Sequence, residues 1–308
     1  MAMAASFDVL ASVRPLLDED ARGGDLTSLA TVPDGRDARA TFLAKADGVV
    51  AGLAAASAVF QCADERTCTT WDVAEGEHVR AGTVLGHVQG DARALLLAER
   101  TALNLMQRMS GVATLANAMA RVAAPAVVLD TRKTAPGLRR FDKWAVRIGG
   151  GRNHRLGLDD MMMIKDNHVA AAGGVRLAVE AARRYCDLHD VDIEVEVEAR
   201  TLEEVSQVMA SLRETDGPPR GTKPKGARVS RILLDNMARF DPKSEGNVDV
   251  TMLEQALQMV DGRLETEASG NITLETVKRI GQTGVTFVSS GALTHSVPAL
   301  DISLNFDV

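Results

Sequence analysis

The stretch AVVLDTRK (residues 126–133) is apolar through its first half and ends in the charged side chains of Asp130, Arg132 and Lys133. A short apolar run bounded by polar residues predicts a buried β-strand. Five later stretches have the same form: MMMIKDNH (161–168), VDIEVEVE (191–198), RILLDN (231–236), LETEASGN (264–271) and VTFVSSGA (285–292). Helical patterns lie between some of them, as at 250–260 and 273–281. This alternation predicts an α/β fold with a mainly parallel sheet.

Every run carries polar or small residues at its C-terminal end. In a parallel barrel these ends converge on one face and form the active site, whereas an open sheet binds its ligand at a switch point. The sequence has no GxGxxG opening a helix after a first strand and no GxxxxGK[ST], so the barrel is favoured. With six plain runs, we expect an incomplete or atypical barrel. The residues at the ends are Asp130, Thr131, Arg132, Lys133, Lys165, Asp166, Asn167, Glu198, Asp235, Asn236, Ser269, Gly270, Asn271, Ser289, Ser290 and Gly291.

The run 191–198 alternates acidic and apolar residues, which places its carboxylates on one face of a strand. A solvated acidic face on an edge strand would explain Asp192 and Glu194. Glu198 comes at the end of the strand, where the mouth of a barrel would lie. Carboxylates inside a sheet are costly unless they meet cations, metal or hydroxyl groups. We therefore favour a functional role for Glu198 and, less strongly, for Glu196.

Cations gather in one part of an otherwise acidic chain, whose formal charge is −7. Nine Lys or Arg residues and five Asp or Glu residues fall between Asp130 and His168, and His154 and Arg155 follow a glycine triplet. Arginine side chains pair well with carboxylates, at roughly 1.5–3 kcal/mol for each charge-assisted bond. Acidic residues at other strand ends suit Mg²⁺ shared with a phosphate, or ribose hydroxyls. The pattern predicts a small multi-carboxylate acid bound beside a sugar phosphate with metal.

The first part of the chain has a different pattern. A helix is expected over 7–22, and strands and turns of a small open sheet over 38–52 and 68–90. Residues 93–123 are helical in pattern, with Gly111 expected to separate two helices. Arg100 and Arg108 in this stretch are, from pattern alone, solvated or salt-bridged side chains. Segment 213–229 is rich in Pro, Gly and charge, which predicts a mobile surface loop.

Composition excludes several functional classes. An acidic chain has no general attraction for nucleic-acid backbones or acidic membranes, and 3% aromatic residues offer few stacking surfaces. The sequence shows no apolar run that could span a membrane and no signal peptide. Its three cysteines fit no disulfide or metal pattern. We expect neither a nucleic-acid nor a membrane partner. We place the protein in the cytoplasm, or in an organelle interior if a transit peptide is removed.

Several longer motifs resemble one family. They include ERTALNLMQRMSG (99–111), DTRKTAPGLR (130–139), GGGRNHRLGL (149–158), IKDNH (164–168), ILLDN (232–236), EASGNITLE (267–275) and SSGALTHSVPALDISL (289–304). Together they are similar to quinolinate phosphoribosyltransferase, in the order of that family and over nearly the whole chain. The stretch from TEASGN to THS resembles the plant-type branch. The segment 213–229 departs from the family pattern because it is longer than in most relatives.

The resemblance implies a fold and a reaction. The fold would be an N-terminal open α/β sandwich with an interface helix (1–115), followed by an atypical, incomplete α/β barrel (116–308). The last residues of the chain would pack back on the first domain. The reaction would join quinolinate to phosphoribosyl pyrophosphate with Mg²⁺, giving nicotinate mononucleotide, pyrophosphate and CO₂ in de novo NAD biosynthesis. A homodimer, or a larger assembly of dimers, would form each site between one barrel and the N-terminal domain of the partner.

The resemblance also implies a role for each motif residue. Quinolinate carboxylates would be held by Arg132, His154, Arg155 and Lys165, with Arg100 supplied by the partner subunit. Catalytic positions would be Lys133, near the phosphoribosyl donor, and the pair Glu198 and Asp235. That pair would serve ribose hydroxyls and, indirectly through pyrophosphate, Mg²⁺. Donor-site contacts would come from Thr131 and from the turns Ser269-Gly270-Asn271 and Ser290-Gly291-Ala292.

Two alternatives stay open at this point. A phosphoribosyltransferase of the same fold could act on nicotinate or another pyridine acid. A non-catalytic homologue could bind a pyridine acid without turnover, although such a protein would be expected to lose the acidic pair Glu198 and Asp235.

Overall fold

The computed structural model of the chain describes residues 7–219 and 225–307. It contains two compact units, and each is described here by itself. The first comprises Met1–Asn117, Ala135–Gly150 and Ser296–Val308, and the second comprises Ala118–Thr134 and Gly151–His295. None of the helices in the described ranges is both long and apolar enough to cross a bilayer.

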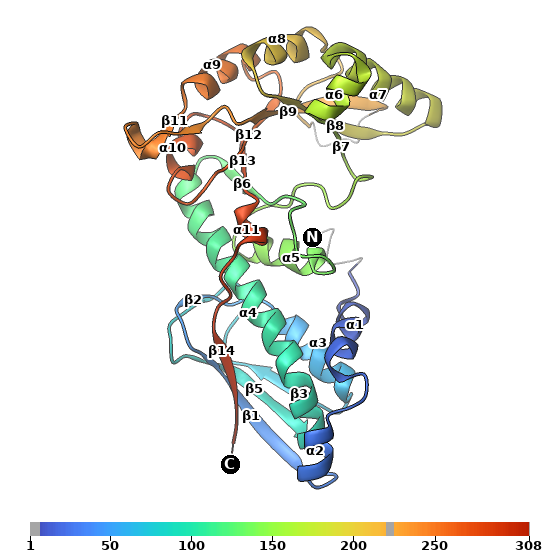
Figure 1. The fold of residues 1–308 in the computed structure, drawn as a ribbon, viewed down its shortest axis with the longest axis vertical. Helices are drawn as coiled ribbons and strands as arrows, with labels where there is room; N and C mark the ends of the chain where they lie inside the picture. Colours follow the sequence, from blue (N-terminus) through green and yellow to red (C-terminus); the bar gives the residue numbers. More distant parts are fainter. Residues whose placement is uncertain (1–6, 220–224, 308) are drawn as a thin grey trace. The chain divides into compact units, whose positions relative to one another are not determined.

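The first unit is built on an antiparallel sheet with the strand order β14-β1-β5-β3 (Figure 1). Its strands are β1 (Asp37–Ala44), β3 (Cys68–Trp71), β5 (Val84–Asp91) and β14 (Ile302–Phe306), and β2 (Gly48–Val49) pairs separately with β4 (His78–Val79). The C-terminal strand β14 lies against β1, so both ends of the chain contribute to this unit.

Helices of the first unit are α1 (Val9–Ala21), α2 (Leu26–Thr31), α3 (Leu53–Ala63) and α5 (Arg139–Ile148). Aromatic contacts join the sheet to α3: the ring of Phe42 on β1 lies 6.0 Å from Phe60 on α3 and 4.9 Å from Trp71 on β3. Because alternate residues of β1 point toward α3, the sheet and the helix form the two layers of a sandwich. The small open sheet expected here is confirmed.

The helix α4 (Ala92–Ala123) runs unbroken through Gly111, so the prediction of two helices separated at that residue is wrong. A single glycine costs a helix interior only about 1 kcal/mol, and packing here requires a small residue. A Cβ on Gly111 would lie 2.2 Å from the carbonyl oxygen of Pro298, and one on Gly149 would lie 2.3 Å from that of Ala113. Glycine at these positions lets backbone segments pack closely against α4.

The second unit contains a parallel sheet with the strand order β6-β13-β12-β9-β8-β7. Its strands are β6 (Val127–Leu129), β7 (Met162–Ile164), β8 (Ile193–Ala199), β9 (Ala227–Asp235), β12 (Glu265–Ser269) and β13 (Phe287–Ser289). All six apolar runs of the sequence therefore form strands. The first strand pairs with the last and the others follow in chain order, which is the connectivity of a barrel. The ladder is interrupted between β6 and β7, where Leu129 bridges only to Arg152.

Helices follow most of these strands, and in Figure 1 the helices α6 to α9 form an arc outside the sheet. They are α6 (Asp166–Ala172), α7 (Val175–His189), α8 (Leu202–Ala210), α9 (Thr251–Val260), α10 (Val277–Gly281) and α11 (Ala292–His295). A short excursion after β9 holds β10 (Arg239–Phe240), η2 (Glu245–Asn247) and β11 (Val248–Asp249). The mixed α/β architecture predicted from the sequence is confirmed.

The segment 213–229 is not a loop throughout. Its last residues belong to β9, and Asp216 anchors its first part by accepting hydrogen bonds from the backbone of Val229 (2.9 Å) and Arg213 (2.7 Å). The carboxylate of Asp216 also forms a buried ion pair with Arg183 on α7. The rest of the predicted loop, at 220–224, lies outside the described residues. The polar composition of the segment predicted a loop, but the buried carboxylate of Asp216 connects the segment to β9 and to α7.

Candidate active site

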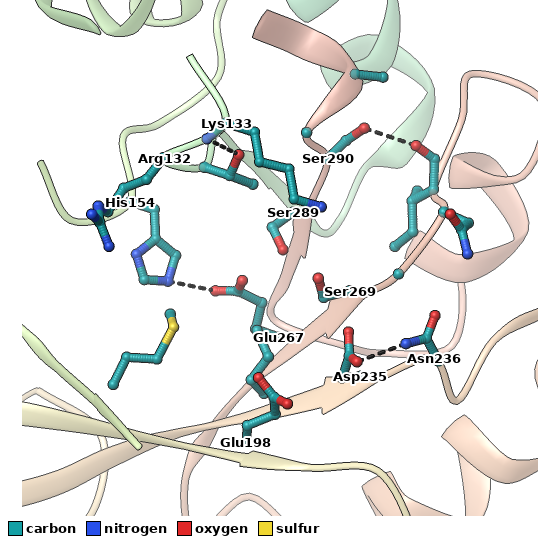
Figure 2. Close-up of a pocket in the computed structure, with 18 of the residues that line it drawn as sticks. Arg132, Lys133, His154, Glu198, Asp235, Asn236, Glu267, Ser269, Ser289 and Ser290 are labelled. Carbon is teal, nitrogen blue, oxygen red and sulfur yellow. Dashed lines mark hydrogen bonds and ion pairs between the residues drawn. The ribbon is translucent and has the colours of Figure 1, made fainter. Parts of the chain in front are cut away.

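The C-terminal ends of all six parallel strands open into one cavity of about 830 Å³ in the second unit. Figure 2 shows Arg132, Lys133 and His154 on one side of it and Asp235 with Asn236 on the other. The predicted strand-end and loop residues line this cavity, except Asp130, which is buried, and Asn167, which is exposed. The lining includes Thr131, Arg132, Lys133, His154, Arg155, Lys165, Glu198, Asp235, Ser269, Gly270, Asn271, Ser290, Gly291 and Ala292.

Arg100 is the exception among the residues that the family resemblance selected. It lies on α4 in the first unit with an exposed side chain, and it is not one of the residues that line the cavity. Its expected role, reaching into the site of a partner subunit, stays a prediction. Arg108 on the same helix forms a two-bond ion pair with Asp142 on α5, at 2.7 and 2.8 Å. The interpretation of Arg108 as a salt-bridged side chain is confirmed.

The basic loop is positioned from within by Asp130, at the end of β6. This carboxylate is fully buried and accepts hydrogen bonds from the backbone of His154 (2.9 Å) and the side chain of Asn153 (2.5 Å). On the other side of the turn, Thr131 accepts a hydrogen bond from the backbone of Lys133 (3.0 Å). The charged end of β6 therefore holds the loop that carries His154 and Arg155.

Two guanidinium groups, those of Arg132 and Arg155, lie on this wall. The buried Nε of Arg132 has no hydrogen-bond partner among the residues that the structure describes. Arg155 donates to the carbonyl oxygen of Met161 at 3.2 Å. Burial lowers the pKa of Arg155, and the nearby charge of Arg132 lowers it further. An anionic ligand would stabilise this arrangement, because it would relieve the repulsion between Arg132 and Arg155 and accept a hydrogen bond from Nε of Arg132.

The imidazole of His154 is held at both ring nitrogens. Nε2 lies 2.8 Å from Glu196 and 3.3 Å from Glu267, and Nδ1 accepts a hydrogen bond from the backbone N–H of Arg155 at 2.7 Å. Burial lowers the pKa of His154, but the bonds to the two carboxylates outweigh burial and raise the pKa to about 9. Only a ring without a proton on Nδ1 can accept the Arg155 bond, so the geometry shown is that of the Nε2–H form.

The acidic side of the cavity comes from β8 and β9. Glu198 forms an ion pair of 3.1 Å with Lys165, and Asp235 accepts a hydrogen bond from the side chain of Asn236 at 2.6 Å. Burial raises the pKa of Asp235, and the charge of Glu198 raises it further. Two carboxylates that repel one another in this way fit a divalent cation, because a cation would relieve the repulsion.

Small residues line the remaining side, at the ends of β12 and β13. Gly270 has a φ of +105°, and a Cβ there would lie 2.3 Å from Oδ1 of Asn236. A Cβ on Gly291 would lie 2.7 Å from Cδ of Lys133. The hydroxyl of Ser290 donates to the carbonyl oxygen of Ile272 at 2.7 Å, which fixes the turn between the two strand ends. Glycine at both positions therefore leaves room for functional side chains from neighbouring strands.

Sequence reasoning missed part of the site. Glu267 lines the cavity and bonds to His154, yet the pattern of residues 264–271 pointed only to the small residues at its end. A usable signal was present, because Glu265, Glu267 and Ser269 alternate with less polar residues as Glu194, Glu196 and Glu198 do. Glu196 proved to be fully buried on a central strand, which excludes a solvated edge strand as its explanation. Other lining residues not singled out are Met163, Leu233, Ile272, Thr273 and His295.

Known proteins resemble this chain over nearly its whole length. A chloroplastic nicotinate-nucleotide pyrophosphorylase (carboxylating) of Arabidopsis thaliana is 53% identical over 305 residues, covering 98% of this chain and 84% of that protein. A mitochondrial quinolinate phosphoribosyltransferase (decarboxylating) 2 of Nicotiana glauca is 51% identical over 303 residues, covering 98% and 83%. The crystal structure of NadC from Streptococcus pyogenes is 34% identical with a TM-score of 0.81, covering 96% and 95%.

Two family models match the chain in sequence. One, described as the N-terminal domain of quinolinate phosphoribosyl transferase, matches residues 25–110. The other, described as the C-terminal domain, matches residues 112–305 and so includes every residue that lines the cavity. The resemblance drawn from the motifs is confirmed, and the chain belongs to the quinolinate phosphoribosyltransferase family.

Proposed function

We propose that this protein transfers the phosphoribosyl group of phosphoribosyl pyrophosphate to quinolinate, with loss of CO₂. The products are nicotinate mononucleotide and pyrophosphate, a step of de novo NAD biosynthesis. The observation that carries the proposal is the buried, unused Nε donor of Arg132 next to Arg155. A pyridine with two carboxylates supplies both the acceptor and the negative charge that this wall lacks. Family membership and the names of the relatives support the same activity.

The donor sugar would occupy the acidic and small-residue sides of the cavity. Glu198 and Asp235, which line the cavity, would accept hydrogen bonds from ribose hydroxyls. The turns at Gly270 and Gly291 have the small residues that a phosphate needs for close approach. Mg²⁺ bound with pyrophosphate would lie near the same two carboxylates and neutralise the negative charge of the departing group. Lys133, lining the cavity beside Gly291, would contact the donor.

The protein side of the mechanism is mainly positioning and electrostatics. The basic wall orients quinolinate so that its ring nitrogen faces ribose C1. The nitrogen forms the new C–N bond as the bond to pyrophosphate breaks, and the leaving oxygen takes the electron pair. Glu198 and Asp235 favour the positive charge that builds on the ribose. The C–C bond to the adjacent carboxylate then breaks, its electrons stay beside the positively charged nitrogen, and a proton from solvent replaces CO₂.

We further propose a homodimer, or a larger assembly of dimers, in which Arg100 of one subunit serves the cavity of another. Its exposed position on α4 in the first unit supports this role. An activity assay on a mixture of two variant proteins tests this shared site. Arg100→Ala subunits and Arg155→Ala subunits, each with weakened quinolinate binding, should form some sites of normal activity when combined. No recovery of activity in a mixed population that does exchange subunits would contradict the shared site.

The compartment is also a proposal. The relatives named above are chloroplastic or mitochondrial. We propose an organelle interior or the cytoplasm for this chain, and fluorescence microscopy of the full-length gene product in its own cells would distinguish them.

The activity is tested by mass spectrometry of the products after incubation with quinolinate, phosphoribosyl pyrophosphate and Mg²⁺. Nicotinate mononucleotide and CO₂ in equal amounts are expected. Parallel reactions with nicotinate distinguish the phosphoribosyltransferase alternative, because nicotinate yields the same nucleotide without CO₂. Donor binding by calorimetry without any product would instead favour the non-catalytic alternative and remove the proposed activity.

A further inference from the structure

A cluster of charged side chains lies inside the barrel, and one of its members, Glu267, also lines the cavity. It consists of Glu196 on β8, Arg231 on β9 and Glu267 on β12, and we call it the buried charge cluster. Glu196 and Glu267 have 0% and 1% of their surface exposed. Arg231 donates to Glu267 at 3.1 Å, and its guanidinium stacks on the ring of Phe287 at 4.1 Å. Buried ionised groups are costly, so a cluster of this kind requires an explanation.

Fold stability alone does not provide that explanation. Replacing a buried ion pair by apolar residues of similar volume is often neutral or stabilising. A metal is not needed to balance the charge either, although His154, Glu196 and Glu267 are close enough together to hold one. Arg231 already supplies a cation: burial lowers its pKa, but the carboxylates of Glu196 and Glu267 outweigh burial and raise it.

The buried charge cluster meets the cavity at Glu267, which lines it, and at His154, which also lines it and bonds to both carboxylates of the cluster. Both carboxylates bond to Nε2 of the ring, at 2.8 Å for Glu196 and 3.3 Å for Glu267. Figure 2 shows the ring directed toward Glu267. On its other side, Nδ1 accepts the backbone N–H of Arg155 at 2.7 Å. The ring is therefore fixed between the cluster and the backbone of a cationic residue that lines the cavity.

Direct binding of substrate by the ring nitrogens is not what this geometry offers, since both nitrogens already have protein partners. The ring joins the cluster to Arg155 instead. The guanidinium of Arg155 also donates to the carbonyl oxygen of Met161 at 3.2 Å. A shift of the ring would move the Arg155 backbone, and misplacing a binding group by about 1 Å can cost a large factor in rate.

We infer that Glu196, Glu267 and Arg231 are positioning residues, which set the place of Arg155 in the carboxylate-binding wall through His154. The inference rests on the proposed function, because the effect is expressed through the acidic substrate. Glu196 carries the clearest test, since it bonds to His154 but does not line the cavity. Replacing Glu196 can therefore affect substrate binding only through a residue such as His154.

The experiment is a double-mutant cycle of Glu196→Gln and Arg155→Ala in the full-length enzyme. Glu196→Gln should raise the KM for quinolinate about tenfold and leave the KM for phosphoribosyl pyrophosphate unchanged. Added to Arg155→Ala, it should have little further effect, because residues that act through one another are not additive. Additive effects of the two substitutions, or an unchanged quinolinate KM in Glu196→Gln, would overturn the inference.

Glu265→Gln is the matched control. Glu265 lies on the same strand as Glu267 and bonds to the same Arg231 at 3.3 Å, whereas the carboxylates bonded to Nε2 of His154 are those of Glu196 and Glu267. It should leave the quinolinate KM as in the wild type. An equal rise in both Gln variants would indicate a general structural role and reject the inference. If Glu196→Gln fails to fold, Glu196→Asp is measured in the same cycle, with the same criteria.

Calorimetry separates this inference from the proposed function. Quinolinate titrated into each variant reports binding without turnover. A wild type that binds quinolinate but makes no product contradicts the proposed function and leaves the positioning test intact. If the wild type is active and Glu196→Gln binds quinolinate as tightly as the wild type, the positioning role alone is contradicted.

Discussion

Lys165 and Glu198 form an ion pair of 3.1 Å across the ends of the adjacent strands β7 and β8. The basic and acidic sides of the cavity therefore meet at this pair. The side chain of Glu198 is 6% exposed and that of Lys165 is 43% exposed. A ligand can displace the lysine more easily than the carboxylate, so Glu198 is the fixed member of the pair.

Glu198→Gln should lower kcat by about tenfold or more, because the site loses negative charge where positive charge builds on the ribose. It also leaves Lys165 without its carboxylate. Steady-state kinetics with both substrates measure the effect. Glu203→Gln, at an exposed position in the first turn of α8, is the control and should behave as the wild type. A fully active Glu198→Gln variant would remove Glu198 from the mechanism.

Arg155→Ala should raise the KM for quinolinate by more than about tenfold, which corresponds to a buried charge-assisted contact. Arg152→Ala is the control from the same loop: Arg152 is exposed and does not line the cavity. Initial-rate measurements at varied quinolinate give both constants. An Arg155→Ala enzyme with unchanged KM and kcat would place Arg155 outside the quinolinate site.

Removal of Mg²⁺ should abolish turnover and leave quinolinate binding in place. The cation is expected near Glu198 and Asp235, whereas the carboxylates of quinolinate are expected at Arg132 and Arg155. Rates after chelation and after restoring Mg²⁺ test the first half of the prediction. Calorimetry of quinolinate binding in chelator tests the second half. Undiminished product formation without divalent cation would show that Mg²⁺ is not required.

Gly270→Ala should lower kcat beyond what its loss of thermal stability explains. The new Cβ would displace Asn236, whose side chain bonds to Asp235, and the residue would be strained at a φ of +105°. Gly262→Ala separates the two effects, because Gly262 also has a positive φ, of +69°, but faces open space. Activity and thermal unfolding are measured for both variants. Equal kcat values in the two would mean that Asn236 has no role in placing Asp235.

Asp216→Ala should destabilise the second unit by about 3–5 kcal/mol, because it leaves the buried guanidinium of Arg183 without its carboxylate. The two side chains are 1% and 6% exposed, so solvent offers little compensation. Urea denaturation followed by circular dichroism measures the loss. Glu214→Ala, at an exposed position of the same segment, should change the free energy of unfolding by less than about 0.5 kcal/mol. Similar losses in both variants would mean that the ion pair is not the anchor.

The strand positions and the cavity residues followed from local signals. In β9, Ile232, Leu233 and Leu234 are buried and apolar directly before the chain emerges at Asp235. The same signal marked the ends of all six strands. Gly111 shows the limit of local reasoning: its propensity indicates a break, but the helix continues because a neighbouring backbone needs the space.

The amino-acid sequence by itself determined which residues end strands, and since parallel strands place those ends on one face, it also determined which side chains share the cavity. Only the tertiary structure decided how these charges are paired. Glu196, Glu267 and Arg231 are far apart in sequence, and nothing local distinguishes a carboxylate that meets solvent from one that meets His154. The physical reason is that an ion pair depends on distance in space and on burial, and both arise only when the strands are brought into register.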